Sequence, residues 1–266
     1  MSYLEWGDPR NREVLVCVHG LTRTGHDFDE VARALCGQFR VVCPDVAGRG
    51  DSERLPDPML YGIPQYVGDM VTLIARLDVE GVSWLGTSMG GLIGMALAAQ
   101  AASPVKRLAL NDAGPLVTRV SLERIASYVG KSPTFATLQD AEQYVRSVSA
   151  PFGPHSDAQW RFLAQTWLRR NDDGTWRAAY DPRIAQAFSA DKDLELWGLY
   201  VAVHCPTLVL RGEGSDLLTR ETAAEMTRRG PRAKVVEIRG VGHAPTLLHA
   251  DQIAIVREFF LQGLSA

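Results

Sequence analysis

The chain has 266 residues, 46% of them hydrophobic and 22% charged, which is enough to bury a sizeable core in one large domain. Its formal net charge of −3 and its scattered Lys and Arg residues argue against a nucleic-acid-binding surface or a patch for anionic membranes. No apolar stretch approaches the about 18 residues of a membrane-spanning helix, and the N-terminal residues do not resemble a secretory signal.

The four cysteines, Cys17, Cys36, Cys43 and Cys205, show no CxxC spacing. Three of them lie in or beside apolar runs, where cysteine behaves as a small hydrophobic residue. Neither a disulfide framework nor a zinc site is expected. We therefore expect a reduced, cytoplasmic protein that binds no metal and is a monomer or a homodimer.

Short apolar runs and amphipathic segments alternate along the chain. Most of the runs are continuous rather than alternating, as in parallel strands that are buried on both faces. Helical spacing of apolar residues relates Phe28 to Leu35 and Met70 to Leu77, and Asp251 can cap a final helix. This order predicts an α/β fold with a mainly parallel sheet. Strands are expected at residues 3–6, 14–18, 40–43, 82–85, 105–110, 207–210 and 235–238.

One interval, between residues 110 and 207, contains no convincing strand and is too long for a single crossover helix. Helical patterns occur at residues 122–129, 141–148 and 159–168. We predict that residues 115–204 form a helical insertion over the carboxyl edge of the sheet, while residues 1–114 and 205–266 form the core. The insertion also contains Trp160, Trp167, Trp176 and Trp197, which we expect to be mostly its own core, with one or two facing a pocket.

Residues 86–90 read Gly-Thr-Ser-Met-Gly and lie between an apolar run and a helical stretch rich in small residues. A strand-to-helix turn of this composition forces its serine into a strained conformation with an exposed hydroxyl. The same five residues can also be a glycine-rich turn with an idle serine. We take Ser88 as the candidate nucleophile.

A serine hydroxyl needs a base to remove its proton. Among the six histidines, His243 follows the last predicted strand in a glycine-containing loop that can reach across the sheet edge. His243 is therefore the candidate base.

The base in turn needs a carboxylate that orients the ring and stabilises its charged form. Asp216 follows the strand predicted at 207–210, and an acid late in the chain suits the order Ser, Asp, His. Asp112, which ends the strand predicted at 105–110, is the alternative acid, and Glu213 is a weaker one. We expect Asp216.

An oxyanion forming at the acyl carbon needs hydrogen-bond donors. The backbone N–H of Met89 is one candidate, and that of Leu21, in the loop after the strand at 14–18, is the other. His19 in this loop is expected to brace it through both ring nitrogens. Thr22 and Arg23 lie beyond it as candidate substrate-binding residues, although Arg23 more readily pairs with a nearby acid such as Asp45.

These motifs together resemble the α/β-hydrolase superfamily. The resemblance rests on His19-Gly20, on Asp45-x-x-Gly48-Arg49-Gly50-x-Ser52, on the Gly86–Gly91 elbow, and on Asp216 and Gly242-His243. It covers nearly the whole chain and implies a mainly parallel central sheet flanked by helices, with a helical cap inserted between the sixth and seventh strands. It also implies Ser88, Asp216 and His243 as the catalytic triad. A single strand-like run before residue 14 is a departure that shortens the usual first hairpin.

Serine at the elbow, in place of aspartate, argues against dehalogenase and epoxide-hydrolase chemistry. We expect an esterase that hydrolyses a small-molecule carboxylic ester through an acyl-enzyme, with no metal or organic cofactor. A carbon–carbon bond hydrolase or a lactonase of the same fold is the alternative. A non-catalytic, hydrolase-like sensor is a remote third possibility, because some receptors retain an intact triad.

Overall fold

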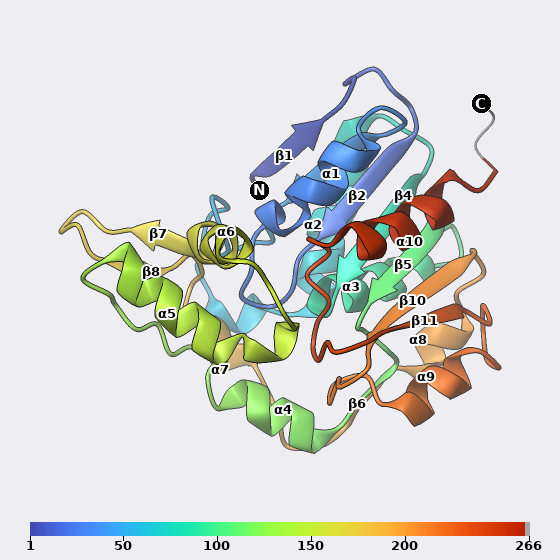
Figure 1. Ribbon diagram of the computed structural model, residues 1–266. Coiled ribbons are helices and arrows are strands. Elements are labelled where there is room, and N and C mark those ends of the chain that lie inside the picture. The colour runs from blue at the N-terminus through green and yellow to red at the C-terminus, as the bar shows by residue number, and fades with distance from the viewer. Residues whose placement is uncertain (264–266) are drawn as a thin grey trace.

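The computed structural model of the protein describes residues 1–263 and is built around one twisted sheet between two layers of helices (Figure 1). The sheet has seven strands, and all neighbours pair in parallel except the first strand, which is antiparallel to its neighbour. The strand order is β1 (Tyr3–Trp6), β3 (Arg40–Pro44), β2 (Val14–Val18), β4 (Val82–Thr87), β5 (Val105–Asn111), β10 (Thr207–Gly212) and β11 (Lys234–Ile238). The predicted strands are therefore confirmed to within two residues at each end.

The continuous apolar runs follow from burial of the sheet on both faces. Along β2, Val14, Val16 and Val18 pack into one hydrophobic cluster, whereas Leu15 and Cys17 pack into the other. Both faces of this strand are dry, so an alternating pattern is not needed.

Helices cover the two faces unequally. The first cluster contains side chains from α2, α3, α8 and α9, and the second contains side chains from α1 and α10, which also contact each other. The bounds are α1 (Asp29–Leu35), α2 (Ile63–Leu77), α3 (Met89–Ala98), α8 (Trp197–Val201), α9 (Arg220–Met226), α10 (Ala250–Leu261), η1 (Gly25–Phe28) and η2 (Pro58–Leu60).

Contrary to the expectation from the sequence, Asp251 does not cap α10. His249 is the N-cap residue and makes no capping bond through its side chain, and Asp251 lies in the first turn.

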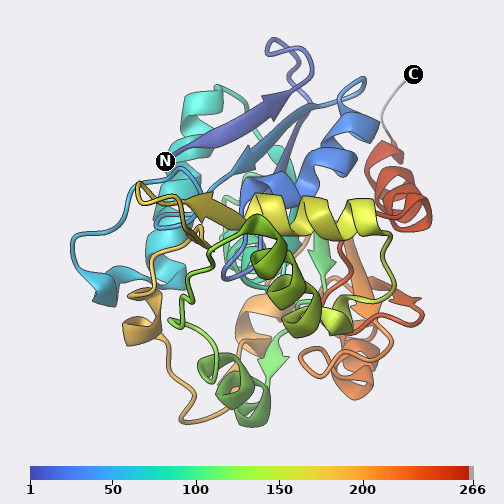
Figure 2. The ribbon, with the colours of Figure 1, turned by 60° about the vertical axis from the view of Figure 1, so that its left-hand side comes forward.

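Residues 115–204, which we call the inserted segment, leave the sheet after β5 and return to it at β10 (Figure 1). In chain order β5 and β10 are the fifth and sixth strands of this sheet, whereas the insertion was predicted between the sixth and seventh. The difference arises because a single strand precedes β2. Figure 2 shows α6 and α5 lying across the strand ends. Besides α8, the segment holds β6 (Leu116–Val117), α4 (Arg119–Ala126), α5 (Leu138–Val148), η3 (Ala150–Phe152), α6 (Asp157–Trp167), β7 (Leu168–Arg170), β8 (Trp176–Ala178), α7 (Ile184–Ala187) and β9 (Leu194–Glu195).

The sequence missed the four short strands of this segment. They form two small antiparallel ladders, β6 with β9 and β7 with β8. Strands of two or three residues are too short to give a periodic pattern. Of the tryptophans, Trp160 and Trp167 are 9% exposed, and Trp167 also lines a cavity described below.

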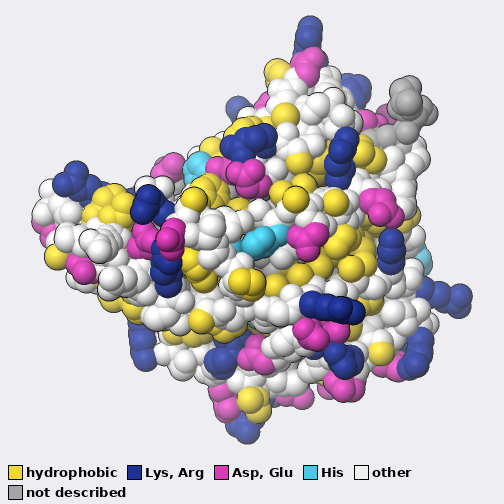
Figure 3. All heavy atoms as spheres, viewed as in Figure 1, with side chains coloured by type: hydrophobic (Ala, Val, Ile, Leu, Met, Phe, Trp, Pro, Cys, Tyr) yellow, Lys and Arg dark blue, Asp and Glu magenta, His cyan; other side chains and the backbone are white. Residues whose placement is uncertain are grey.

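Charged side chains of both signs are interspersed over the face seen in Figure 3. No helix within residues 1–263 is long and apolar enough to cross a membrane. In the same residues, no three His, Cys, Asp or Glu side chains gather into a possible metal site.

Candidate active site

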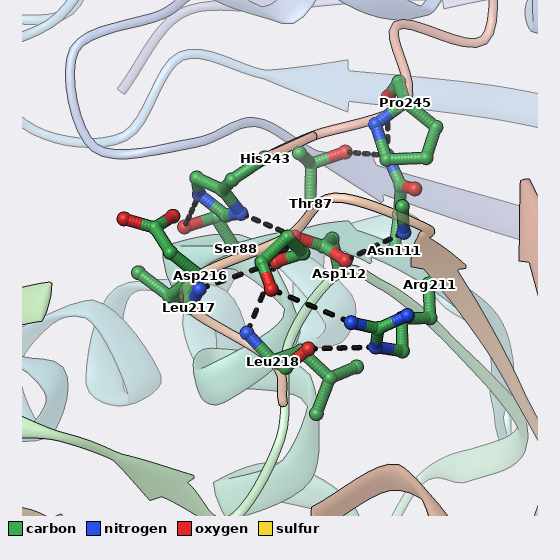
Figure 4. Close-up of polar contacts among 12 residues, drawn as sticks. Thr87, Ser88, Asn111, Asp112, Arg211, Asp216, Leu217, Leu218, His243 and Pro245 are labelled. Atoms are coloured by element: carbon green, nitrogen blue, oxygen red, sulfur yellow. Dashed lines mark hydrogen bonds and ion pairs between the residues drawn. The ribbon is translucent and has the colours of Figure 1, made fainter. Parts of the chain in front are cut away.

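Ser88 lies in the sharp turn between β4 and α3, with φ 52° and ψ −114°. A positive φ is strained for a residue with a side chain, and surrounding bonds must hold it. The Ser88 N–H donates to the carbonyl of Asn111 at 2.9 Å, and the Ser88 carbonyl accepts from Gly91 and Leu92 in the first turn of α3. The hydroxyl is thereby turned toward the carboxyl edge of the sheet (Figure 4).

Two glycines make this turn possible. A Cβ at Gly86 would lie 2.2 Å from the carbonyl carbon of Gly90, and a Cβ at Gly90 would lie 2.0 Å from the carbonyl oxygen of Val18. Both contacts are with backbone, which cannot move aside. The pattern around Ser88 thus has a steric cause, because β2, β4 and α3 meet here without space for side chains.

His243, in the loop after β11, lies between Ser88 and a carboxylate (Figure 4). Its Nε2 is 3.0 Å from Ser88 Oγ, and its Nδ1 is 2.6 Å from Oδ2 of Asp112. Since an ionised carboxylate only accepts, Nδ1 carries the proton and Nε2 is free to accept from the serine hydroxyl. The arrangement is a continuous hydrogen-bonded chain of hydroxyl, imidazole and carboxylate.

The carboxylate in this chain corrects the sequence-based expectation, which favoured Asp216. Asp112 directly follows β5, the strand next to β4, and is fully buried. Its Oδ1 accepts from the N–H of Gly212 at 2.9 Å, and its Oδ2 also accepts from the hydroxyl of Ser215 at 2.5 Å. These donors compensate the buried charge and fix its direction.

Asp216 points elsewhere. Its carboxylate is half exposed and pairs with both Nε and Nη2 of Arg124, on α4 of the inserted segment, at 2.5 and 3.0 Å. The hydroxyl of the residue before it, Ser215, donates to the carboxylate of Asp112. Glu213 is also outside the chain, because its carboxylate accepts from the N–H of Gly240.

Asn111 joins the loops of this site, and no pattern in the sequence points to it. Its side-chain amide donates to the hydroxyl of Thr87, beside Ser88, at 2.9 Å and to the carbonyl of Pro245, beyond His243, at 2.8 Å. One fully buried amide thus ties the elbow to the histidine loop, and Pro245 lies 134 residues after Asn111 in the sequence.

The structure places Leu21 and Met89, whose backbone amides are the predicted oxyanion donors, near Ser88. A Cβ at Gly20 would be 3.8 Å from Cβ of Ser88, so the loop that carries Leu21 lies against the serine. Met89 is the first residue of α3, where a helix leaves its amides unpaired. Within residues 1–263, neither amide donates a hydrogen bond to another protein group.

His19 braces this loop, as expected from the sequence. It is fully buried; its Nδ1–H donates to the carbonyl of Gly20 at 2.7 Å, and its Nε2 accepts from the N–H of Val46 at 3.0 Å. The Gly20 carbonyl belongs to the same peptide group as the Leu21 N–H, which in a trans peptide points the opposite way. Burial lowers the pKa of His19 to about 4, so the ring is neutral at pH 7.

The neutral, buried His19 predicts a stability loss in mild acid. Its pKa lies below the unfolded value of about 6.5, so the unfolded chain takes up a proton first as the pH falls from about 6.5 toward 4. The free energy of unfolding is expected to decrease across that window by up to about 3 kcal/mol from this residue. Urea titrations of wild type and His19→Asn at several pH values measure it. Between pH 6.5 and 4, the free energy of unfolding should fall less steeply with decreasing pH in the variant than in wild type. An equal pH dependence in the two proteins would contradict the assignment of a neutral, buried His19.

The structure places both candidate substrate-binding residues, Thr22 and Arg23, on the wall of the cavity. Arg23 does pair with an acid, but the acid is Asp27, four residues on, at 2.5 Å, and not Asp45. The Asp45 carboxylate accepts instead from the N–H groups of Gly25 and Asp51. Arg23 also donates to the Leu163 carbonyl, so it links the loop to α6.

A cavity of about 570 Å³ opens above Ser88 and His243. The core supplies its floor, and the inserted segment supplies much of its wall, including Tyr128, Tyr144 and Trp167. A largely apolar cavity of this size, with a few polar groups at one end, is typical of a small-molecule site.

Known proteins support the same reading of the fold. The α/β-hydrolase fold model matches residues 13–250. A 3-hydroxybutyrate-oligomer hydrolase of Cupriavidus necator is 53% identical over 98% of this chain and 92% of its own length. N-formylmaleamate deformylase of Pseudomonas putida is 28% identical over 91% of this chain and 85% of its own length. The crystal structure of an α/β hydrolase from Novosphingobium aromaticivorans aligns with a TM-score of 0.89 and 37% identity, covering 97% of this chain and 92% of that one. The chain therefore belongs to the α/β-hydrolase family.

Proposed function

We propose that the protein is a serine hydrolase that cleaves carboxylic esters through an acyl-enzyme on Ser88. The observation that carries this proposal is the hydrogen-bonded chain from Ser88 through His243 to Asp112 at the floor of the cavity. In this proposal Asp112 is the orienting acid, in place of Asp216. Two unpaired amides beside the serine complete the requirements of acyl transfer.

The first half of the reaction forms the acyl-enzyme. Ser88 Oγ attacks the acyl carbon while its proton passes to Nε2 of His243. The Leu21 and Met89 amides donate to the oxygen that becomes negative in the tetrahedral intermediate. The bond to the alcohol oxygen then breaks, and His243 returns its proton to the departing alcohol.

The second half releases the acid. Water gives a proton to His243 and attacks the acyl carbon, and the new tetrahedral intermediate collapses with Ser88 Oγ leaving and regaining a proton. Asp112 stabilises the imidazolium formed in each half, because its charge lies 2.6 Å from Nδ1. No bound metal or cofactor enters these steps.

For the substrate, we propose short linear oligoesters of a 3-hydroxy acid. The support is the 53% identity, over nearly the full length of both chains, with the Cupriavidus necator 3-hydroxybutyrate-oligomer hydrolase. A cavity of about 570 Å³ that is partly roofed by the inserted segment suits a short chain better than the surface of a polymer. Residues 115–204 then act as the cap that selects the acyl group.

A substrate panel tests this proposal. The linear dimer and trimer of 3-hydroxybutyrate should be hydrolysed, with kcat/KM at least about tenfold above that for β-butyrolactone or a vinylogous 1,5-diketone, since each tenfold reflects about 1.4 kcal/mol of transition-state binding. Product acid is measured by chromatography. Preference for the diketone or the lactone would replace the ester assignment with the alternative chemistry. Absence of turnover on every substrate, by a folded enzyme, would contradict the proposed function.

A further inference from the structure

Arg49 is a fully buried cation whose polar contacts are all with neutral groups. Its Nε donates to the Leu21 carbonyl at 2.9 Å, and its Nη1 donates to the Ala47 carbonyl and to the Tyr66 hydroxyl, each at 2.8 Å. The guanidinium also lies 5.1 Å from the ring centre of Tyr66 and 5.6 Å from that of Tyr61. No carboxylate of residues 1–263 comes within ion-pair distance of it.

Two other arginines with shielded side chains, Arg211 and Arg23, have acid partners. The side chain of Arg211 is 6% exposed and pairs with Glu237, and that of Arg23 is 12% exposed and pairs with Asp27. A buried charge without a partner is costly, and removal from water is usually compensated by a counter-charge. The buried Asp181 does not serve here, because Arg183 and the hydroxyl of Tyr61 engage it.

Arg49 lies next to the proposed oxyanion hole, where a positive charge can act on the reaction. It contacts both residues whose amides are the proposed oxyanion donors: the carbonyl of Leu21, and Sδ of Met89, which is 3.7 Å from Nη2. His19 holds the peptide group before Leu21, and Arg49 holds the one after it. The two side chains together fix the direction of the Leu21 N–H.

We propose that Arg49 is a positioning residue for the oxyanion hole and that its unpartnered charge stabilises the negative oxygen of the tetrahedral intermediate. The inference rests on the proposed function. In the resting enzyme the guanidinium lacks a counter-charge, and one forms nearby only during the reaction. A charge arranged in this way lowers the barrier, because its interaction is stronger in the transition state than in the ground state.

A purely structural role makes a different prediction. The backbone of Arg49 bridges Tyr180, and the neighbouring Gly50 N–H donates to Ala179, so this loop also anchors the inserted segment. If Arg49 only anchors it, substitution should lower thermal stability and raise KM through a displaced cavity wall. It would not selectively weaken binding of a tetrahedral mimic.

The test compares Arg49→Gln, which loses the charge, with Arg49→Lys, which keeps it. Arg107→Gln is the matched control, because Arg107 also donates to backbone carbonyls (Phe259 and Gln262) and packs on an aromatic ring, away from the site. The measurements are the melting temperature, kcat and KM for p-nitrophenyl butyrate, and the inhibition constant of butylboronic acid, which adds to the serine as a tetrahedral anion. Hydrolysis by wild type is first shown to require Ser88.

We expect Arg49→Gln to lower kcat and the affinity for the boronic acid by a similar factor, about thirtyfold to a hundredfold, with KM within about threefold of wild type. Arg49→Lys should lose less of both, and Arg107→Gln should change only the melting temperature. A folded Arg49→Gln with unchanged kcat and boronate affinity would overturn the inference, as would a loss confined to KM.

If Arg49→Gln does not fold, the kcat of Arg49→Lys tests the inference by itself. Because lysine cannot reproduce the bond from Nε to Leu21, kcat should fall about tenfold, and an unchanged kcat would overturn the inference. Wild type that shows no Ser88-dependent hydrolysis would refute the proposed function instead. The two failures are therefore distinguishable.

Discussion

Asp112→Asn is expected to lower kcat by about ten-thousand-fold, whereas Asp216→Asn should leave it within about threefold. Asparagine at 112 still fits among Gly212, Ser215 and His243, but it no longer stabilises the imidazolium and favours the wrong ring tautomer. Asp216 instead makes a half-exposed ion pair with Arg124, and such pairs contribute little. Initial rates on p-nitrophenyl butyrate measure both effects.

The comparison of the two variants is informative because both substitutions are isosteric and both residues lie at the carboxyl edge of the sheet. Circular dichroism and the melting temperature show whether Asp112→Asn remains folded, since this side chain is fully buried. A crippled Asp216→Asn beside an active Asp112→Asn would reverse the assignment of the acid.

Ser88→Ala is expected to reduce kcat by about 10⁴-fold to 10⁶-fold and to abolish labelling by a fluorophosphonate probe. The loss removes the acyl-enzyme route itself, and what remains comes from binding and the oxyanion donors. Ser127→Ala is the control, because Ser127 is an exposed serine whose hydroxyl donates to the Arg124 carbonyl. Labelling that persists in Ser88→Ala would assign the nucleophile to another residue.

Much of the fold could be predicted because its signals are local. The strands of the central sheet are buried on both faces, so each is a continuous apolar run that can be recognised without knowing its neighbours. The helices that flank the sheet bury one face each, so their apolar residues recur at helical spacing and can also be recognised locally. In the inserted segment the short strands pair mainly through backbone bonds, which leave no pattern in the side chains.

The elbow and the base were predictable from spacing, but the acid was not. Two strands in the sheet, β5 and β10, both lead to an aspartate, and either aspartate satisfies the order Ser, Asp, His. The choice depends on the turn after β10, where Ser215 donates to Asp112 and Asp216, one residue later, pairs with Arg124 of α4. The direction of each side chain is a property of the folded turn and of the arginine it meets.

Asn111 and Arg49 illustrate a second limit. Each acts through contacts with residues remote in sequence, such as Pro245 for Asn111 and Met89 for Arg49. The motif around Arg49 was noted in the sequence, but nothing there shows that its guanidinium is buried without an acid. Only the packing of the loops against the elbow reveals it.

Ser88 is expected to carry the acyl group during turnover, and rapid-quench mass spectrometry detects such a covalent adduct. Wild type is mixed with p-nitrophenyl butyrate, quenched in acid within the first turnover and digested for peptide mapping. We predict one added butyryl group on the peptide that contains Ser88, and none in Ser88→Ala. Release of p-nitrophenol in an initial burst should match the amount of this adduct. Turnover without an adduct on Ser88, or with the butyryl group on another residue, would contradict the assignment of Ser88 as the nucleophile.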